Sequence, residues 1–222
     1  MRVRARCFAI LRELAASSTE LDLADGARLT DAWAALAGRF PGITAHRDWV
    51  RAARNGAYAA WDVPLADGDE VAFLPPVSGG AAAEAATIGL TDGRIDVAAL
   101  EAAVAGPSHG ALVTFVGRAR DHADDGRTVV ELEYEAYPEM AASVLGEIAQ
   151  EAEARWGARL AVVHRTGIVP LGEEAVAIVA AAAHRSEAYE ASRFVIEAIK
   201  ERLPIWKRER FVDGSEWKRS GA

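Results

Sequence analysis

The sequence predicts two α+β domains that are joined near residue 80. Within the first 75 residues, strand-like, helix-like and again strand-like patterns follow one another in a span typical of a small α+β roll. The stretch Pro75-Pro76-Val77-Ser78-Gly79-Gly80 then interrupts these patterns with a stiff exit and a slender backbone. Beyond it, apolar strand patterns alternate with longer helix patterns. The order of elements therefore indicates two α+β units in one chain.

In the first domain the strands are expected over 3–10, around 21–23, over 50–54 and over 70–74, with helices over 11–15 and about 31–40. Thr30 or Asp31 is the expected cap of the longer helix, which Pro41-Gly42 ends. The pair Asn55-Gly56 predicts a tight turn between two strands.

In the second domain, strands are expected over 111–116, 129–137, 160–165 and 175–183, and helices over 96–104, 138–156 and 186–203. Asp96 and Ser186 are the expected helix caps, and Pro138 suits a first helical position. Pro204 ends the last helix, because proline cannot continue one.

Composition excludes several classes of protein. The chain is 51% apolar, enough for a core, and no apolar run approaches the roughly 20 residues that a membrane span needs. The N-terminus runs directly into a strand pattern, so we expect a cytoplasmic protein without a signal peptide. Cys7 is the only cysteine, which excludes an internal disulfide and a cysteine-based zinc site. The net charge of −8 argues against nucleic-acid binding.

Lysine is rare in this chain. Of the 25 basic residues only Lys200, Lys207 and Lys218 are lysines, so surface cations are arginines by default. A lysine kept against this bias can offer an amine that loses its proton, which a guanidinium cannot. Chance placement on a solvated helix face is an equally good explanation of the composition alone.

Two other cationic positions are candidates for binding an anion. His184 and Arg185 come where a predicted buried strand ends and a helix begins, and a helix N-terminus attracts anions. Arg120 follows a predicted apolar strand, and its guanidinium suits phosphate or carboxylate. Taken alone, His184 is better explained as a histidine packed at a strand end and Arg185 as a solvated cation. Arg120 is explained equally well as a surface cation.

Lys200 and Lys207 flank the short stretch Pro204-Ile205-Trp206, within a basic island that includes Arg202, Arg208 and Arg210. Crowding of these cations would favour the neutral form of one amine, which could then act chemically. The helix dipole offers a simpler reason for Lys200, which is expected in the last helical turn.

Helix geometry predicts a homodimer of the second domain. About 14 residues separate Ser186 from Lys200, which is roughly 20 Å along one helix axis at ~1.5 Å per residue. A small substrate cannot reach both ends of such a helix. If His184, Arg185 and Lys200 serve one site, two copies of the chain must share it, with their helices antiparallel across a two-fold axis.

Several stretches resemble the two subunits of molybdopterin synthase. The tail at 71–80, ending in Gly79-Gly80, and the run 8–14 are similar to the small subunit, a ubiquitin-like β-grasp sulfur carrier. The stretches that resemble the large catalytic subunit are 110–120, 132–140, 183–186 and 203–209. Because these matches occur in the right order over nearly the whole chain, the resemblance is specific. It implies a β-grasp domain over 1–80, an Ala-rich linker over 81–87, and an α/β hammerhead-type catalytic domain over 88–222.

The resemblance also implies a role for each matching residue. Gly80 would be activated by an adenylating and sulfurating enzyme and would carry the sulfur as a thiocarboxylate. Lys200 and Lys207 match the family's catalytic lysines, and the residues that match its substrate pocket are Phe115, Arg120, His184 and Arg185. The substrate would be cyclic pyranopterin monophosphate, which receives two sulfurs in molybdenum cofactor biosynthesis. No organic cofactor and no metal are implied.

One departure from the family pattern matters for activity. Gly80 continues into Ala81, and a peptide bond leaves no carboxylate to adenylate. Sulfur transfer therefore requires cleavage after Gly80, by a protease or by the chain itself. One alternative is an uncleaved, non-catalytic sulfur-carrier precursor or protein-interaction module. Another is a phosphate-binding enzyme of a different pathway. The five histidines show no metal-ligand spacing, and no nucleophile elbow occurs.

Overall fold

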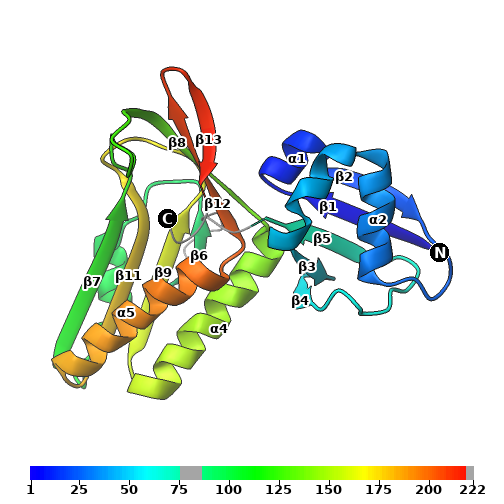
Figure 1. The fold of residues 1–222 in the computed structure, drawn as a ribbon. Helices are drawn as coiled ribbons and strands as arrows, with labels where there is room; N and C mark the ends of the chain where they lie inside the picture. Colours follow the sequence, from blue (N-terminus) through cyan, green and yellow to red (C-terminus); the bar gives the residue numbers. More distant parts are fainter. Residues whose placement is uncertain (76–86, 219–222) are drawn as a thin grey trace. The chain divides into compact units, whose positions relative to one another are not determined.

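The computed structural model describes residues 1–75 and 87–218 and divides the chain into two compact units, Met1–Pro76 and Val77–Ala222 (Figure 1). The expected end of the first domain at Gly80 falls among residues 76–86, outside the described ranges, as does most of the linker over 81–87. That division therefore stays a prediction. Among the described residues, no helix combines the length and the apolar character needed to cross a membrane.

Unit 1 is a mixed sheet covered by helices. Its elements are β1 (Arg2–Cys7), α1 (Ile10–Leu14), β2 (Ser18–Asp22), α2 (Leu29–Arg39), the 3₁₀ helix η1 (Pro41–Trp49), β3 (Arg51–Arg54), β4 (Ala57–Ala59) and β5 (Glu70–Leu74). The strand order is β2-β1-β5-β3-β4. The pair β1 and β5 is parallel and the other pairs are antiparallel. This arrangement is the predicted α+β roll.

The core of unit 1 forms because buried and exposed side chains alternate along its strands. Val3, Ala5 and Cys7 of β1 are buried, whereas the alternating residues Arg2 and Arg4 are exposed. Helix α2 packs its apolar stripe against that buried face, and Trp33 meets the ring of Phe73 edge-on at 5.0 Å. Burying one face of the sheet in this way fixes the strand register, because a slip of one residue would expose the apolar side chains.

The first cap of α2 differs from the sequence prediction. The helix begins after Arg28, not after Thr30 or Asp31, and Asp31 is its third residue. The carboxylate of Asp31 accepts a hydrogen bond from the Arg28 backbone at 2.7 Å, so it stabilises the helix start from inside the first turn. The predicted turn at Asn55-Gly56 is confirmed by the positive φ angles of both residues.

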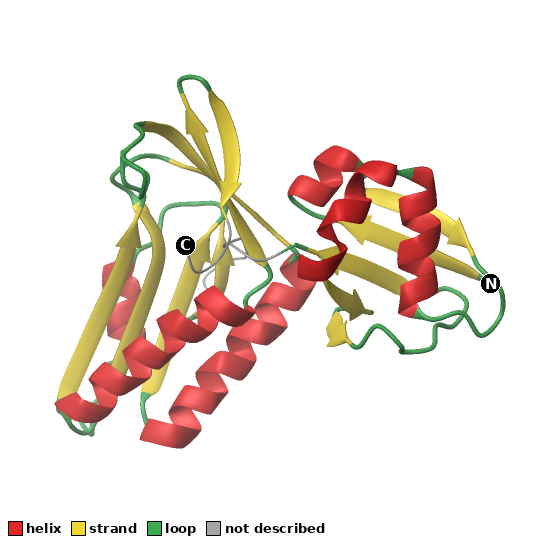
Figure 2. Cartoon of the chain, in the orientation of Figure 1, coloured by secondary structure: helices red, strands yellow, loops and turns green. Residues whose placement is uncertain are grey.

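Unit 2 contains two four-stranded sheets and three helices among its described residues. Its elements are β6 (Ile88–Thr91), α3 (Val97–Val104), β7 (Ala111–Arg118), β8 (Val129–Ala136), α4 (Pro138–Trp156), β9 (Arg159–Arg165), β10 (Gly167–Val169), β11 (Glu174–Ala182), α5 (Arg185–Arg202), β12 (Ile205–Phe211) and β13 (Gly214–Lys218). The sheets have the orders β6-β9-β11-β7 and β10-β8-β12-β13. Figure 2 shows α4 and α5 lying together along one face of the first sheet.

The two faces of the first sheet are covered by different helices. Ala177, Val179 and Ala181 of β11 pack toward α3. The alternate residues of that strand are also buried, and α5 contacts β11 and β7. Strand β11 is therefore central and apolar on both sides, whereas β7 is an edge strand.

The helix caps of unit 2 match the prediction at one of two positions. The side chain of Asp96 accepts a hydrogen bond from the Ala99 backbone at 3.0 Å, as expected. Ser186 is not the cap of α5, because the helix begins at Arg185 and His184 is the capping residue. The hydroxyl of Ser186 instead donates to the adjacent Glu187.

The buried carboxylate of Asp69 links several segments of unit 1 through hydrogen bonds. Asp69 is 6% exposed and accepts hydrogen bonds from Arg54 at 2.6 Å, the Ala66 backbone at 2.7 Å and Asn55 at 2.8 Å. Burial alone would raise the pKa of Asp69, but these donors outweigh it and hold the pKa below its usual value.

We predict that Asp69→Asn destabilises unit 1 by about 1–3 kcal/mol, because charge-assisted hydrogen bonds at a buried position are lost. A carboxyl whose pKa is lowered by folding stabilises the fold above its unfolded pKa of about 4, and this contribution disappears as the pH falls through the folded value. Urea unfolding of the full chain, followed through NMR amide signals of residues 1–75, measures both effects. Asp62→Asn, at an exposed position, is the control. Equal stability of the two variants at pH 7 would contradict the prediction.

Candidate functional site

Lys207 lies in β12, with about a quarter of its side chain exposed. Its Nζ is 2.9 Å from a carboxylate oxygen of Glu209, which is 4% exposed. The two residues are two positions apart in a strand, so they share one face of it. Across the ladder, Lys207 stands directly opposite Tyr134 of β8. The amine of Lys207 is therefore held by an ion pair and flanked by an aromatic ring.

Burial shifts the pKa values of two ring side chains in this cluster, Tyr134 and His164, toward their neutral forms. Burial raises the pKa of the Tyr134 phenol to about 12, and the carboxylate of Glu209 adds to the shift. The Tyr134 ring meets His164 of β9 edge-on at 5.3 Å. Burial lowers the pKa of His164 to about 4, which outweighs its hydrogen bond to the Arg165 carbonyl. Glu209 is thus the carboxylate that pairs with Lys207 in this cluster.

The arginines of the basic island do not crowd the lysines as the sequence suggested. Each arginine pairs with its own carboxylate: Arg202 with Glu151 at 2.6 Å, Arg208 with Glu133, and Arg210 with Glu131 at 2.8 Å. Pairing of this kind cancels the local positive charge that crowding requires. Lys200 lies in the last turn of α5, as predicted, and is exposed.

Arg120 and Phe115 both belong to the region of the edge strand β7. Phe115 is 38% exposed in that strand, opposite Ile178 of β11. Arg120 follows two residues after the strand ends, where half of its side chain is exposed and its guanidinium contacts Asp124. Arg120 is thus available to a ligand from solvent.

His184 and Arg185 stand exposed at the first turn of α5, as predicted. His184 has an extended backbone and Arg185 is the first helical residue, so the free N–H groups of the helix start lie beside a guanidinium. The backbone just before this helix start packs closely against Gly110. A Cβ atom at Gly110 would lie only 2.6 Å from the carbonyl oxygen of Ala183, so a side chain there is not accommodated.

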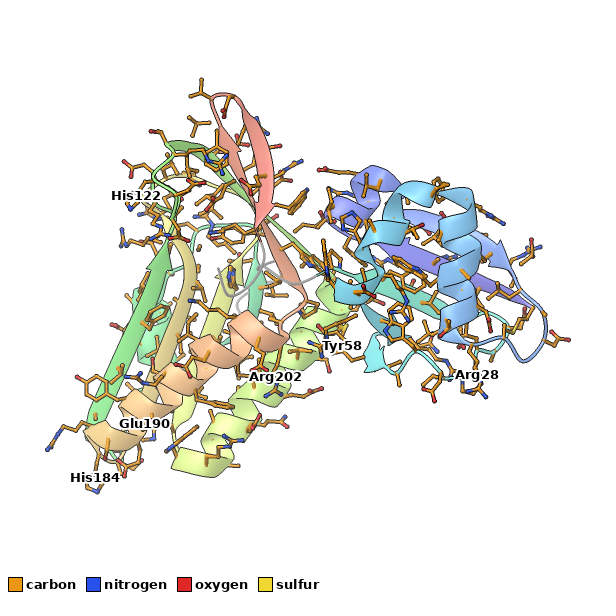
Figure 3. All side chains as sticks on the ribbon, in the orientation of Figure 1. Arg28, Tyr58, His122, His184, Glu190 and Arg202 are labelled. Carbon is orange, nitrogen blue, oxygen red and sulfur yellow. The ribbon has the colours of Figure 1, made fainter. Side chains whose placement is uncertain are left out.

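A single copy of unit 2 does not bring these residues into one pocket. Figure 3 labels His184 and Arg202 at the two ends of α5, and Lys200 lies in the turn that contains Arg202. His184 and Arg120 are likewise separated, because they lie at opposite ends of strand β7. Its first residue, Ala111, is opposite Ala182, whereas its last, Arg118, is opposite Glu174. His184 therefore adjoins one end of β7 and Arg120 follows the other.

Glu209, Tyr134 and His164 were not found by sequence reasoning. The spacing of Lys207 and Glu209 would have indicated a pair on one face if 205–211 had been predicted as a strand. Gly80 lies outside the described residues. Burial raises the pKa of the Cys7 thiol to about 12, so this cysteine is not a reactive thiolate.

Comparison with known proteins divides the chain in the same order as the structure. The family model "ThiS family" matches residues 6–80, and the model "MoaE protein" matches residues 90–202. The chain therefore has a ThiS-type, ubiquitin-like unit followed by a MoaE-type unit.

The relatives and the solved structures agree for the second unit. The chain is 46% identical to the molybdopterin synthase catalytic subunit 1 of Mycobacterium tuberculosis over 58% of this chain and 87% of the relative. It is 45% identical to the catalytic subunit of Oryza sativa subsp. indica over 64% and 76%. The crystal structure of molybdopterin synthase from Staphylococcus aureus superposes with a TM-score of 0.58 and 35% identity, covering 60% of this chain and 97% of that one. The chain belongs to the MoaE protein family.

We predict that Gly110→Ala destabilises unit 2 by about 1–3 kcal/mol, because the added methyl meets a backbone oxygen that cannot rotate away. Gly146→Ala is the matched control, since a Cβ at this position in α4 meets nothing within 4 Å. That change should stabilise the helix by about 0.5–1 kcal/mol. Urea denaturation of the full chain measures both variants. If Gly110→Ala is as stable as the parent, the Ala183 carbonyl can move aside at little cost and the prediction is wrong.

Proposed function

We propose that this chain is a molybdopterin synthase in which the sulfur carrier and the catalytic unit are made as one polypeptide. The observation that carries this proposal is the order of the two family matches, of which the carrier match ends at Gly80. The relatives of the second unit are named molybdopterin synthase catalytic subunits. The reaction would move sulfur from a thiocarboxylate at Gly80 to cyclic pyranopterin monophosphate.

In this proposal the carrier tail supplies the reactive group. A thiocarboxylate sulfur is a softer nucleophile than a carboxylate oxygen, and a diglycine arm is narrow enough to enter a pocket. Each transfer forms a carbon–sulfur bond on the pterin and breaks a carbon–oxygen bond at the same carbon. Water then cleaves the carbon–sulfur bond to the Gly80 carbonyl, so that the sulfur stays on the pterin and a carboxylate is left on Gly80. The regenerated carboxylate must then return to an adenylating and sulfurating partner enzyme.

The catalytic unit supplies positive charge and an amine. Arg120, His184 and Arg185 would hold the substrate phosphate, with Phe115 against the pterin. Lys200 or Lys207 would act as the general acid–base or would engage the substrate covalently. The ion pair between Lys207 and Glu209 supports an oriented role for Lys207, because it limits the positions that the amine can take.

These residues form one site only if two copies of the catalytic unit associate. Strand β7 is an eight-residue edge strand whose first seven residues are uncharged, and Leu112 and Phe115 on it are 41% and 38% exposed. An edge of this kind is suited to pairing with another strand. Antiparallel pairing of two copies of β7 would place Arg120 of one copy beside His184 and Arg185 of the other. Because α5 packs on β7, it would also set the two α5 helices antiparallel.

We predict that Leu112→Lys converts the protein from a dimer to a monomer and abolishes pterin conversion, because a charge on the edge blocks strand pairing. Val212→Lys is the control, since this valine is 88% exposed in the β12–β13 turn. Light scattering after size exclusion measures the mass. A dimeric Leu112→Lys variant would place the interface elsewhere.

We predict that the active protein is cleaved after Gly80, because the uncut chain has no carboxylate to adenylate. Co-expression of 1–80 and 81–222 as separate chains should give full conversion of cyclic pyranopterin monophosphate, given the adenylating partner. Mass spectrometry should find the added sulfur on the fragment that ends at Gly80. An active sample that contains only the intact 23.6 kDa chain would contradict the prediction. An uncut chain that binds the partner enzyme without converting the pterin would favour a carrier precursor instead.

A further inference from the structure

The loop between β7 and β8 is held in a fixed shape by its own backbone. The Val129 amide donates to the Asp121 carbonyl at 2.8 Å, and the Ala123 amide donates to the Arg127 carbonyl at 2.9 Å. Ala123 is 3% exposed and packs into the apolar cluster under the loop. The side chain of Asp124, next in the sequence, therefore starts from a fixed point close to Arg120.

Three carboxylates of this loop have different partners. Asp121 pairs with His122 at 2.9 Å, and Asp125 pairs with Arg127 at 2.7 Å. Asp124 pairs with Arg120, the arginine that the proposed function assigns to the substrate phosphate. Figure 3 shows this end of β7, marked by His122, well away from His184. Within one copy of the chain, Asp124 therefore contacts Arg120 at the position where the substrate phosphate would bind.

We propose that Asp124 is an internal competitor for Arg120 that sets the affinity of the phosphate site. This inference rests on the proposed function of Arg120. Both side chains are more than half exposed, so solvent weakens their ion pair and an incoming ligand can replace Asp124. The cyclic phosphate of the substrate, a diester monoanion, gains by the exchange because it can engage the guanidinium fork with two oxygens.

The test uses Asp124→Asn in the processed enzyme. Removing the competing charge should lower the KM for cyclic pyranopterin monophosphate and the inhibition constant of inorganic phosphate by roughly 2- to 5-fold, the range of an exposed ion pair. The kcat should not change. Inhibition by acetate should strengthen by a similar factor, because every anion that replaces Asp124 is freed from the same competition. Thermal unfolding confirms that the variant is folded.

Asp125→Asn is the matched control, because it removes the same charge from the same loop but from a different arginine. A double-mutant cycle separates direct competition from a general change in potential. In an Arg120→Ala background, Asp124→Asn should have no effect. If Asp124→Asn and Asp125→Asn change KM equally, or if the effect persists without Arg120, the inference is wrong.

The same experiment separates this inference from the proposed function. Arg120→Ala should weaken the binding of the pterin and of inorganic phosphate, measured by calorimetry whether or not turnover occurs. If Arg120→Ala binds both as the parent does, Arg120 does not bind the phosphate and both proposals fail at this residue. If Arg120→Ala weakens binding and Asp124→Asn changes nothing, only the competition is excluded.

Discussion

The length and rigidity of helix α5 constrain every account of this protein's chemistry. The helix runs from Arg185 to Arg202 and is anchored on the sheet by buried residues that include Ala188, Val195 and Ile199. At ~1.5 Å per residue, its 18 residues hold the histidine–arginine end roughly 27 Å from the other end. The residues at the two ends of α5 stay this far apart within one copy of the chain, because the helix between them is rigid. The cations of the unit must therefore act separately or be brought together by a second copy.

The electrostatics of unit 2 favours the second possibility. The arginines of the basic island are neutralised by carboxylates of β8 and α4. His184 and Arg185 remain exposed at a helix start, where partial positive charge is already present. Arg120 has a weak, exposed partner. The arginines of the basic island are thus paired with carboxylates inside the unit. The cations proposed to bind a phosphate are exposed near the ends of the edge strand β7.

The sequence predicted most of the elements because local signals specified them. Alternation in β1, the Asp96 cap and the two prolines that bound α4 and α5 each act within a few residues. The strand β12 was missed because its charged residues look like a solvated island. It forms because β8 supplies partners in register, with Trp206, Arg208 and Arg210 opposite Glu135, Glu133 and Glu131. Such long-range complementarity is not visible in either segment alone.

The candidate site shows the same limit. His184, Arg185 and Lys200 were correctly placed at the two ends of one helix, because helical periodicity is a local property. Neither the Glu209 partner of Lys207 nor the contact between Asp124 and Arg120 could be read from spacing. The first depends on a strand that forms by pairing, and the second on a loop shape fixed by backbone hydrogen bonds.

Mixing two inactive variants tests the shared site most directly. Arg185→Ala removes the cation at one end of α5 and Lys200→Ala removes the amine at the other. If one site takes these residues from two copies, a mixed dimer keeps one complete site. Co-expression in equal amounts should then restore about one quarter of the parent rate of pterin conversion, since random pairing makes half of the dimers mixed. If the mixture stays as inactive as either variant alone, although mixed dimers are isolated and folded, the two ends of α5 do not serve one site across two copies.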